Sequence, residues 1–201
     1  MAYTFRALIT CNRSIVFALT LSLTVLSGVI PAHAEILSGR YLLKPSTIET
    51  LFSVKVLGAK AVKGRFKTVG GEMLLDAKRP EASRVKMSVD LESVETNSQR
   101  MTNFLKGPSM FDVAAHPVAV FESTSVRLTG NRSAQIDGFL TLRGKKKRAS
   151  LDVLVEPASK SKDISIQAKG GFFRSLFGMG IGLPIYGDKV RLTVTGTGKR
   201  S

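Results

Sequence analysis

His116 is the residue in this 201-residue chain with the clearest potential for catalysis or metal binding, and it stands alone. The chain has two histidines, and the other, His33, lies in an N-terminal segment with different properties. A lone imidazole cannot build a histidine metal site, and no carboxylates are spaced around His116 as further ligands. A serine triad would have only this base, and no Gly-x-Ser-x-Gly sequence is present. We therefore expect His116 to lie in a turn before Pro117, and we predict no metal site and no catalytic residue.

Two other groups of residues could suggest chemistry. Asp90, Glu92 and Glu95 are close in sequence, but the alternation around them places the first two on a solvent-exposed face, so they do not form a catalytic pair. Gly178-Met-Gly-Ile-Gly182 does not have the spacing of a dinucleotide-binding loop and leads into a segment that contains Pro184. Turn glycines are the better interpretation, and no cofactor is predicted.

The densest charge cluster consists of five basic residues, Arg143, Lys145, Lys146, Lys147 and Arg148. Such a cluster is typical of a solvated hairpin tip. The functional alternative is an electrostatic contact with the phosphates of a lipid bilayer, or with the pyrophosphate head of a prenyl lipid if the tip lies at the mouth of a barrel.

The N-terminal segment has the pattern of a cleaved secretory signal. Arg6 and Arg13 precede an almost wholly apolar stretch, residues 14–30, and Ala32-His33-Ala34 follows with small residues at the spacing that signal peptidase recognises. An uncleaved anchor helix is the alternative. Cleavage after Ala34 would leave one domain, residues 35–201, and would remove Cys11, the only cysteine, so no disulfide or thiol chemistry is expected.

The charge of the chain favours anionic partners. Loss of residues 1–34 reduces the basic count from 30 to 28 against 15 acidic residues. An exported protein without a nucleic-acid motif is expected to meet anionic lipid headgroups or an acidic envelope polymer instead of nucleic acid. A basic surface that is simply solvated is an equal alternative.

Most of the remaining chain alternates with a period of two, which indicates strands with one buried face. The clearest example is Val85, Met87, Val89 and Leu91 against Lys86, Ser88, Asp90 and Glu92. The period changes once, at residues 97–106, where Met101, Phe104 and Leu105 predict a short amphipathic helix with Thr96 or Asn97 as its N-cap. Eight or nine strands with one helical interruption predict an antiparallel barrel or sandwich. The expected strands cover residues 41–57, 61–69, 67–76, 83–92, 118–128, 135–143, 149–156, 163–168 and 188–195.

Several separated motifs resemble the YceI-like family, whose members are periplasmic, lipocalin-like barrels that bind polyisoprenoid or other long-chain lipids. The first motif runs from Tyr41 to Phe66, the second includes Leu105, Pro108, Phe111, Asp112, Val113 and Pro117, the third is Leu140-Thr-Leu-Arg-Gly144, and the fourth is Arg174-Ser-x-Phe-Gly-Met179. The resemblance favours an all-β fold, an extended eight-stranded antiparallel barrel, which is wide enough to hold one ligand. It also implies a periplasmic location.

The chain departs from the family pattern at three positions near its start. Lys44, Thr47 and Val56 stand where the family usually has an aspartate and two histidines. A polar role at these positions is therefore not expected here, and the ligand of this chain can differ from that of better-matched relatives.

An apolar tunnel is the site that these features predict. Phenylalanine and methionine are numerous, and both adapt to a flexible tail. An ordinary packed core is the alternative on residue type alone; the resemblance favours a tunnel that holds a long isoprenoid or fatty chain, in a monomer or homodimer. Two other functions stay open, a solid barrel that binds an acidic partner through its basic surface and an enzyme acting on a bound lipid. The predicted lining residues are Phe52, Val54, Phe66, Met87, Leu91, Phe104, Phe111, Phe121, Leu140, Phe173 and Phe177.

Overall fold

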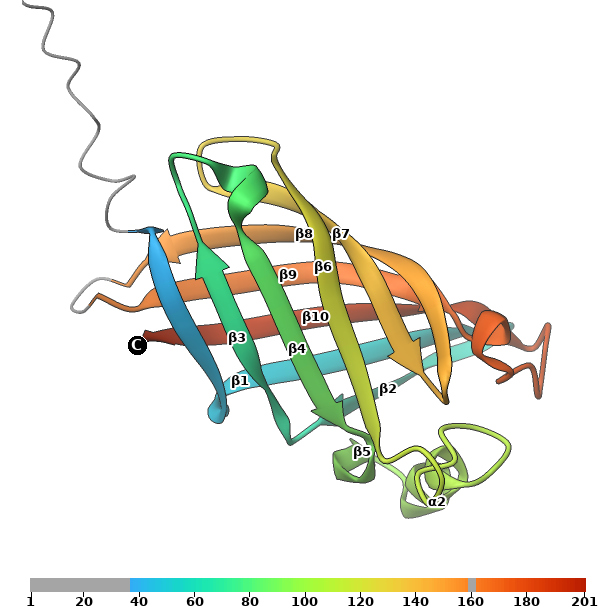
Figure 1. Ribbon diagram of the computed structural model, residues 1–201. Coiled ribbons are helices and arrows are strands. Elements are labelled where there is room, and N and C mark those ends of the chain that lie inside the picture. The colour runs from blue at the N-terminus through green and yellow to red at the C-terminus, as the bar shows by residue number, and fades with distance from the viewer. Residues whose placement is uncertain (1–36, 159–161) are drawn as a thin grey trace, which may run out of the picture. The chain divides into compact units, whose positions relative to one another are not determined.

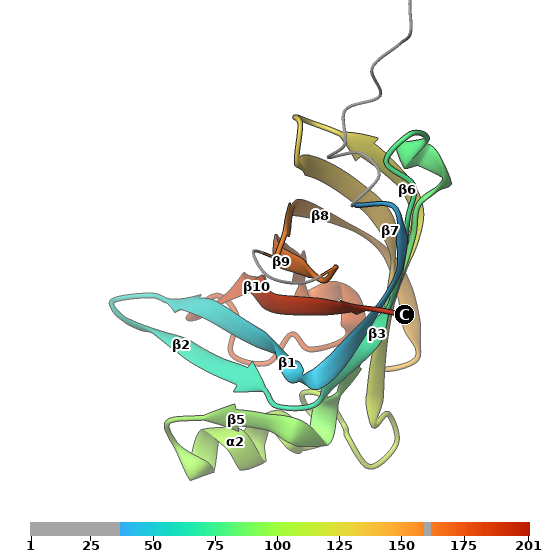
Figure 2. The same ribbon diagram turned by 90° about the vertical axis from the view of Figure 1, so that its left-hand side faces the viewer.

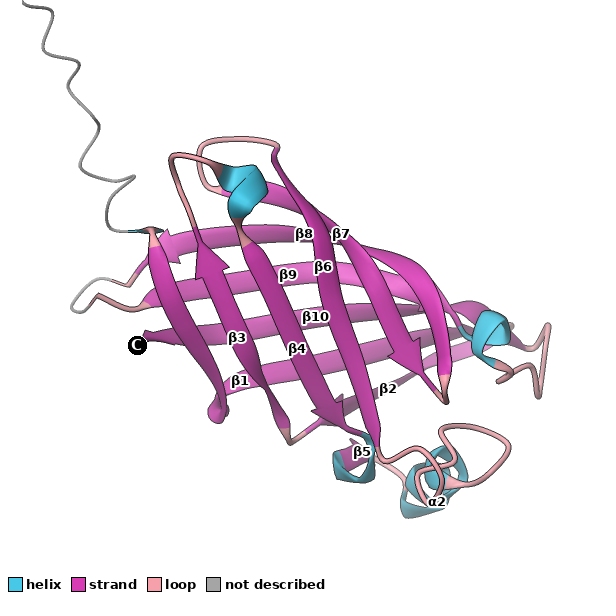
Figure 3. Ribbon diagram, viewed as in Figure 1, coloured by secondary structure: helices cyan, strands magenta, loops and turns pink. Residues whose placement is uncertain are grey.

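A computed structural model describes residues 37–158 and 162–201. The expected signal segment, residues 1–34, lies outside the described residues, so its cleavage stays a prediction. Strands dominate the described chain, and one α-helix, α2, lies between β5 and β6 (Figure 3). The strands are β1 Gly39–Val56, β2 Ala59–Phe66, β3 Val69–Leu75, β4 Arg84–Asp90, β5 Val94–Thr96, β6 Val118–Leu128, β7 Ser133–Leu142, β8 Lys145–Pro157, β9 Ile164–Phe173 and β10 Tyr186–Arg200. The helical elements are α2 Gln99–Lys106 and the short 3₁₀ turns η1 Pro80–Ala82, η2 Leu91–Ser93 and η3 Arg174–Phe177.

Eight strands form a closed antiparallel barrel, which confirms the fold class. The ring runs β1-β10-β9-β8-β7-β6-β4-β3 and closes where β3 pairs with the first part of β1 (Figure 1). Alternation along the strands directs one set of side chains inward. On β4, for example, Val85 is buried and Met87 is packed against the core, whereas Lys86 is exposed. The inward-facing side chains therefore form one apolar core inside the ring.

β2 and β5 extend the sheet outside the ring. The second half of β1, from Thr50 to Val56, pairs with β2 instead of β3, and β2 in turn pairs with β5. Figure 2 shows β5 beside β2 and α2 packed against β5. The first half of β1 therefore closes the ring, and the second half joins β2 to it.

The change follows an irregularity at Lys44–Thr47. Leu43 is opposite Gly198 of β10 and Ile48 is opposite Gly196, so five steps along β1 match two along β10. Pro45 has no N–H to donate to a ladder, which favours a bulge there. The Thr47 hydroxyl spans the bulge by donating to the carbonyl of Thr197 at 2.9 Å. At this position, where the family usually has another polar residue, Thr47 has a structural contact.

Two local predictions need correction. The N-cap of α2 is Ser98, whose Oγ accepts from the N–H of Met101 at 3.3 Å, because the Thr96 hydroxyl instead bonds the Ser98 carbonyl and the Thr102 hydroxyl. The basic cluster lies only partly in a hairpin tip: Arg143 forms the β7–β8 turn with Gly144, with φ values of 49° and 67°, whereas Lys145–Arg148 belong to β8. Two consecutive residues with positive φ make a tight two-residue turn, which leaves the lysines in the strand.

The described helices are too short and too polar to cross a lipid bilayer.

Candidate functional site

A cavity of about 120 Å³ lies inside the ring. Every strand of the ring except β3 contributes to the cavity wall. Among the described residues, the lining side chains are apolar apart from those of Thr50 and Arg174. The lining residues are Thr50, Phe52, Val54, Phe66, Met87, Val89, Leu91, Leu105, Met110, Phe111, Ala119, Phe121, Leu140, Leu142, Ala149, Leu151, Ala168, Gly170, Gly171, Phe172, Arg174, Met179, Val190, Leu192 and Val194. We call this space the interior cavity.

A second pocket of about 350 Å³ adjoins the interior cavity beside α2, and we call it the mouth pocket. Phe52, Val54, Leu105, Met110 and Arg174 line both spaces, so these residues form the boundary between them. The mouth pocket is more polar than the interior cavity. Its other lining residues are Val62, Ser98, Arg100, Met101, Phe104, Ile181, Gly182 and Tyr186.

A third pocket, of about 620 Å³, occupies the opposite end of the barrel. Some of its lining residues belong to strands that also line the interior cavity. On β4, for example, Val85 lines the third pocket and Met87 lines the interior cavity. It shares no lining residue with the interior cavity. The described barrel thus encloses apolar space at two levels, with side chains packed between them.

The structure brings together most of the predicted tunnel residues. Phe104 lines the mouth pocket and is 44% exposed, as expected for a residue at an opening. Whether any of these residues contacts a ligand stays a prediction. The predicted residues that line the interior cavity are Phe52, Val54, Phe66, Met87, Leu91, Phe111, Phe121 and Leu140.

Phe173 and Phe177 do not line the interior cavity, which corrects their placement. On β9 the inward residue is Phe172, opposite Val190, whereas Phe173 is opposite Lys189 and half exposed on the outer face. Phe177 is buried in η3, where its ring packs edge-on against Phe172 with centroids 5.4 Å apart. Phe177 therefore supports the wall from behind.

Arg174 is a functional candidate that the sequence placed in the fourth family motif but not among the predicted site residues. It is 2% exposed, and its guanidinium donates only to backbone carbonyls: Nε to Gly187 at 3.1 Å, Nη1 to Ile181 at 2.8 Å and to Met179, and Nη2 to Tyr186 at 2.8 Å. Burial lowers the pKa of Arg174, and the nearby Asp188 carboxylate opposes that shift. Because the ordinary pKa of arginine is above 12, the side chain stays charged at neutral pH.

The contacts of Arg174 hold residues 179–187 in place as one wall of the mouth pocket. Asp188 supports the same region, because its carboxylate accepts from the Ser175 backbone N–H at 2.8 Å and from the Ser175 hydroxyl at 2.6 Å. Gly178 follows η3 with φ at 82°, a conformation that favours glycine. The Arg-Ser-x-Phe-Gly-Met motif thus stabilises the loop that follows it.

The basic cluster is divided between the mouth and the outer sheet face. Arg143 donates from Nη1 to the Gly178 carbonyl at 3.0 Å and from Nη2 to the Pro108 carbonyl at 2.9 Å, which ties the β7–β8 turn to the loops at the mouth. Lys146 instead lies 5.0 Å from the centroid of the Phe139 ring. Lys147 and Arg148 are exposed on β8, as is Lys145.

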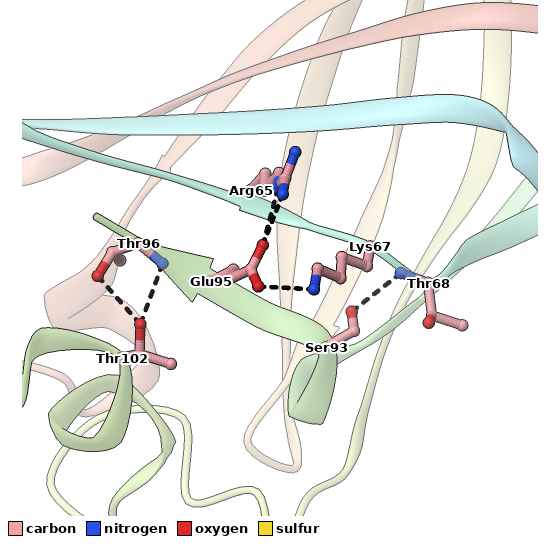
Figure 4. A network of polar contacts seen from close by, with 7 residues as sticks. All are labelled: Arg65, Lys67, Thr68, Ser93, Glu95, Thr96 and Thr102. Carbon is pink, nitrogen blue, oxygen red and sulfur yellow. Dashed lines mark hydrogen bonds and ion pairs between the residues drawn. The ribbon is translucent and has the colours of Figure 1, made fainter. Parts of the chain in front are cut away.

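A polar network fastens α2 and β5 to the barrel (Figure 4). The Glu95 carboxylate of β5 accepts from Arg65 at 2.8 and 2.9 Å and forms an ion pair with Lys67 at 2.6 Å. The Thr96 N–H donates to the Thr102 hydroxyl of α2 at 3.0 Å. The helix that borders the mouth pocket is therefore held through β5 by an exposed acidic residue.

We predict that acid loosens this attachment. Hydrogen bonds from Lys67, and then from Arg65, lower the pKa of Glu95 below its ordinary value. A carboxyl group whose pKa is lower in the folded state stabilises that state above its unfolded pKa, and the contribution is lost as pH falls through the folded pKa. An NMR titration of the Met101 methyl group should show a transition below the ordinary glutamate range, and Glu95→Gln should give the acid-form signal already at pH 7. A Glu95 carboxyl signal that titrates at or above its ordinary value would contradict this.

Among the described residues, no cluster of three or more histidine, cysteine, aspartate or glutamate side chains is arranged to hold a metal ion. His116 is half-buried beside Gly144, where its backbone N–H donates to the Asp112 carbonyl at 2.8 Å.

Comparisons with known proteins agree with this architecture. A UPF0312 protein of Ectopseudomonas mendocina is 39% identical over 93 residues, which cover 46% of this chain and 49% of that protein. The chain thus spans about half the length of the curated relative that it matches. The crystal structure of Burkholderia cenocepacia BcnA superposes with a TM-score of 0.70 at 20% identity, covering 77% of this chain and 98% of that one.

A second solved structure has the same fold. It is a polyisoprenoid binding domain from Saccharophagus degradans implicated in plant cell wall breakdown, with a TM-score of 0.64 at 14% identity, over 82% of this chain and 99% of that domain. Residues 31–197 match the YceI-like domain family, which confirms the resemblance seen in the motifs. Because the family model matches most of the sequence, the chain belongs to the YceI-like family.

Proposed function

We propose that this protein binds a long-chain lipid, isoprenoid or fatty, and acts as a non-enzymatic binding or carrier protein in the periplasm. The observation that carries the proposal is the interior cavity, whose wall is apolar and which adjoins a more polar mouth pocket. A hydrocarbon tail suits the first space and a polar head suits the second. The solved polyisoprenoid binding domain with the same fold supports this class of ligand. The proposed periplasmic location depends on the predicted secretory signal in residues 1–34.

The volumes limit how the tail is held. An apolar cavity of about 150 Å³ can take up benzene, so the interior cavity, at about 120 Å³, accommodates a short stretch of chain. A longer tail must continue through the boundary residues into the mouth pocket, of about 350 Å³. Met110 lies at this boundary, and its unbranched side chain can change rotamer around a tail. Each buried methylene contributes roughly 0.8 kcal/mol before the chain is ordered.

The mouth pocket is suited to an anionic head. Arg100 and Arg174 both line it. Four N–H groups of Arg174 are used by backbone carbonyls, and among the described residues its remaining Nη2 N–H has no partner. A phosphate or carboxylate head placed here would meet two guanidinium groups, which bind such anions well.

The proposal is tested by identifying what the purified protein carries. Organic extraction followed by mass spectrometry is expected to yield a long-chain lipid at close to one molecule per barrel. Stripped protein should take up added prenyl phosphate or fatty acid. Empty protein that takes up neither would reject the proposal and favour a solid barrel that binds an acidic partner, whereas turnover of a supplied lipid would indicate an enzyme.

We also propose that the mouth of the barrel contacts an anionic membrane, where it collects or delivers the lipid. Leu57 in the β1–β2 turn is 76% exposed and Ile185 is 56% exposed, and the Leu57 N–H donates to the Ile185 carbonyl at 2.9 Å. Ile181 and Leu183 are exposed in the same loop. Lys55 and Lys60, both exposed, flank the turn. Exposed apolar side chains with lysines on either side are suited to binding a membrane with acidic headgroups.

Removing apolar area from this rim should weaken membrane binding. We expect Ile185→Asp to reduce co-sedimentation with phosphatidylglycerol vesicles by about tenfold, because an inserted isoleucine contributes roughly 1.5 kcal/mol and the aspartate adds charge repulsion. Leu128→Asp is the matched control, since Leu128 is 53% exposed at the opposite end of the barrel and should leave vesicle binding unchanged. Equal losses in the two variants would show that the rim has no special role.

A further inference from the structure

Thr50 places an oxygen atom deep in a wall that, among the described residues, is apolar apart from Arg174. It lies on β1 between the buried inward-facing residues Ile48 and Phe52, and it is 3% exposed. Its Oγ1 has no hydrogen-bond partner among the residues that the structure describes. Burying a hydroxyl group without a partner is unfavourable, and valine would fill nearly the same volume without that penalty. The hydroxyl therefore needs an explanation beyond packing.

The surroundings of Thr50 offer it little. Thr47 lies in the bulge of β1 and donates to the Thr197 carbonyl. Thr50 lies in the regular part of the strand, where the neighbouring backbone carbonyls are used by the ladder. A trapped water requires at least two polar partners. Among the described residues, Arg174 is the only other polar side chain in the cavity wall, and it contacts residues 179–187 at the mouth. The natural partner of the hydroxyl is an atom of the ligand.

The position of Thr50 indicates which part of the ligand that atom belongs to. Val54, which borders the mouth pocket, is opposite Val190, whereas Thr50 is opposite Val194. Four residues of strand correspond to about 13 Å. A lipid whose head lies in the mouth pocket would therefore present the middle of its chain to Thr50, not its head.

We propose that the ligand carries an uncharged oxygen, a hydroxyl or a carbonyl, within its hydrophobic chain, and that Thr50 selects it by a hydrogen bond. A threonine hydroxyl can donate to a carbonyl and can accept from a hydroxyl. A charged group at this depth would be buried among apolar side chains without a counter-ion. This inference rests on the proposed lipid-binding function and narrows it to an oxygenated long-chain lipid.

The test compares stearate with a series of stearates that carry one hydroxyl at successive positions along the chain. Their affinities are measured for the stripped wild-type protein, for Thr50→Val and for Thr195→Val. Thr195 is one position from Val194 on β10, opposite Glu49, and alternation places it on the outer face, so it is a matched control. We expect the wild type and Thr195→Val to prefer a mid-chain hydroxystearate over stearate by about fivefold. Thr50→Val should lose that preference and bind stearate more tightly.

Three outcomes would overturn the inference. The first is an unchanged preference in Thr50→Val, and the second is no preference at any hydroxyl position in the wild type. The third is a lower Tm of the stripped Thr50→Val protein, because a variant that removes an unpartnered hydroxyl should have a higher Tm. If the wild type binds no chain at all, the proposed function itself fails, which is a different result from binding without preference.

Discussion

Replacement of Ala168 by leucine should abolish the uptake of long-chain lipids while leaving the barrel folded. Ala168 is buried on β9, opposite Val153 and Val194, and lines the interior cavity. The added isopropyl group enters a space of about 120 Å³ and occupies the place of the tail. Displacing about four methylenes removes roughly 3 kcal/mol, or more than a hundredfold in Kd.

The stability of this variant separates blocking from damage. Filling a cavity with apolar atoms is neutral or stabilising when the space exists, so the Tm of stripped Ala168→Leu should not fall. Gln167→Leu is the control, because Gln167 is exposed on the outer face of the same strand and should leave uptake unchanged. A folded Ala168→Leu protein with normal uptake would mean that the tail does not occupy the interior cavity.

Replacement of Arg174 should have the largest effect on stability. Arg174→Met keeps much of the volume of the side chain but leaves the carbonyls of Met179, Ile181, Tyr186 and Gly187 without their donor. Several unsatisfied polar groups around a buried site cost about 3 to 5 kcal/mol. In a chain of this length, thermal denaturation should show a Tm lower by roughly 10 °C.

Two further variants sharpen this prediction. Arg174→Lys keeps the charge but has a single ammonium that cannot reach the same set of carbonyls, so it should recover only part of the loss. Arg191→Met removes an exposed arginine of β10 and should change the free energy of unfolding by less than about 0.5 kcal/mol. A small effect of Arg174→Met, equal to that of Arg191→Met, would show that the loop 179–187 is held by other contacts.

The sequence was sufficient to predict the class of fold and the large apolar side chains of the cavity wall, since eight of the predicted residues line the interior cavity. Alternation depends on side chains within one strand, so Met87 and Phe121 could be assigned to the interior before any pairing was known. The same rule could have identified Thr50, which shares its face with Ile48 and Phe52. Threonine is small and polar, however, so its residue type gives no indication of a place in an apolar lining.

Features that depend on pairing or on local competition could not be predicted in this way. Phe172 and Phe173 are adjacent and identical, and the expected strand ended at Ala168, whereas β9 continues to Phe173 and its alternation places Phe172 inward, opposite Val190. The burial of Arg174 has no signature in residue type, because arginine is ordinarily exposed and its partners here are backbone carbonyls. Ser98 became the N-cap because Thr96 was already engaged.

The exchange of partners along β1 determines how the barrel wall can yield. In the described chain β3 pairs only with Gly39–Leu43 of β1, and from Thr50 onward β1 pairs with β2, whose last residue, Phe66, lines the interior cavity together with Phe111. The rings of Phe66 and Phe111 lie with their centroids 5.7 Å apart. Among the described residues, the link from β2 to β3 has backbone hydrogen bonds from the Lys67 N–H to the Ser93 carbonyl at 3.3 Å and from the Asp90 N–H to the Thr68 carbonyl at 2.9 Å, whereas neighbouring ring strands such as β9 and β10 share long ladders. If the proposed lipid enters from the side, this is the joint where few main-chain hydrogen bonds have to break and form again.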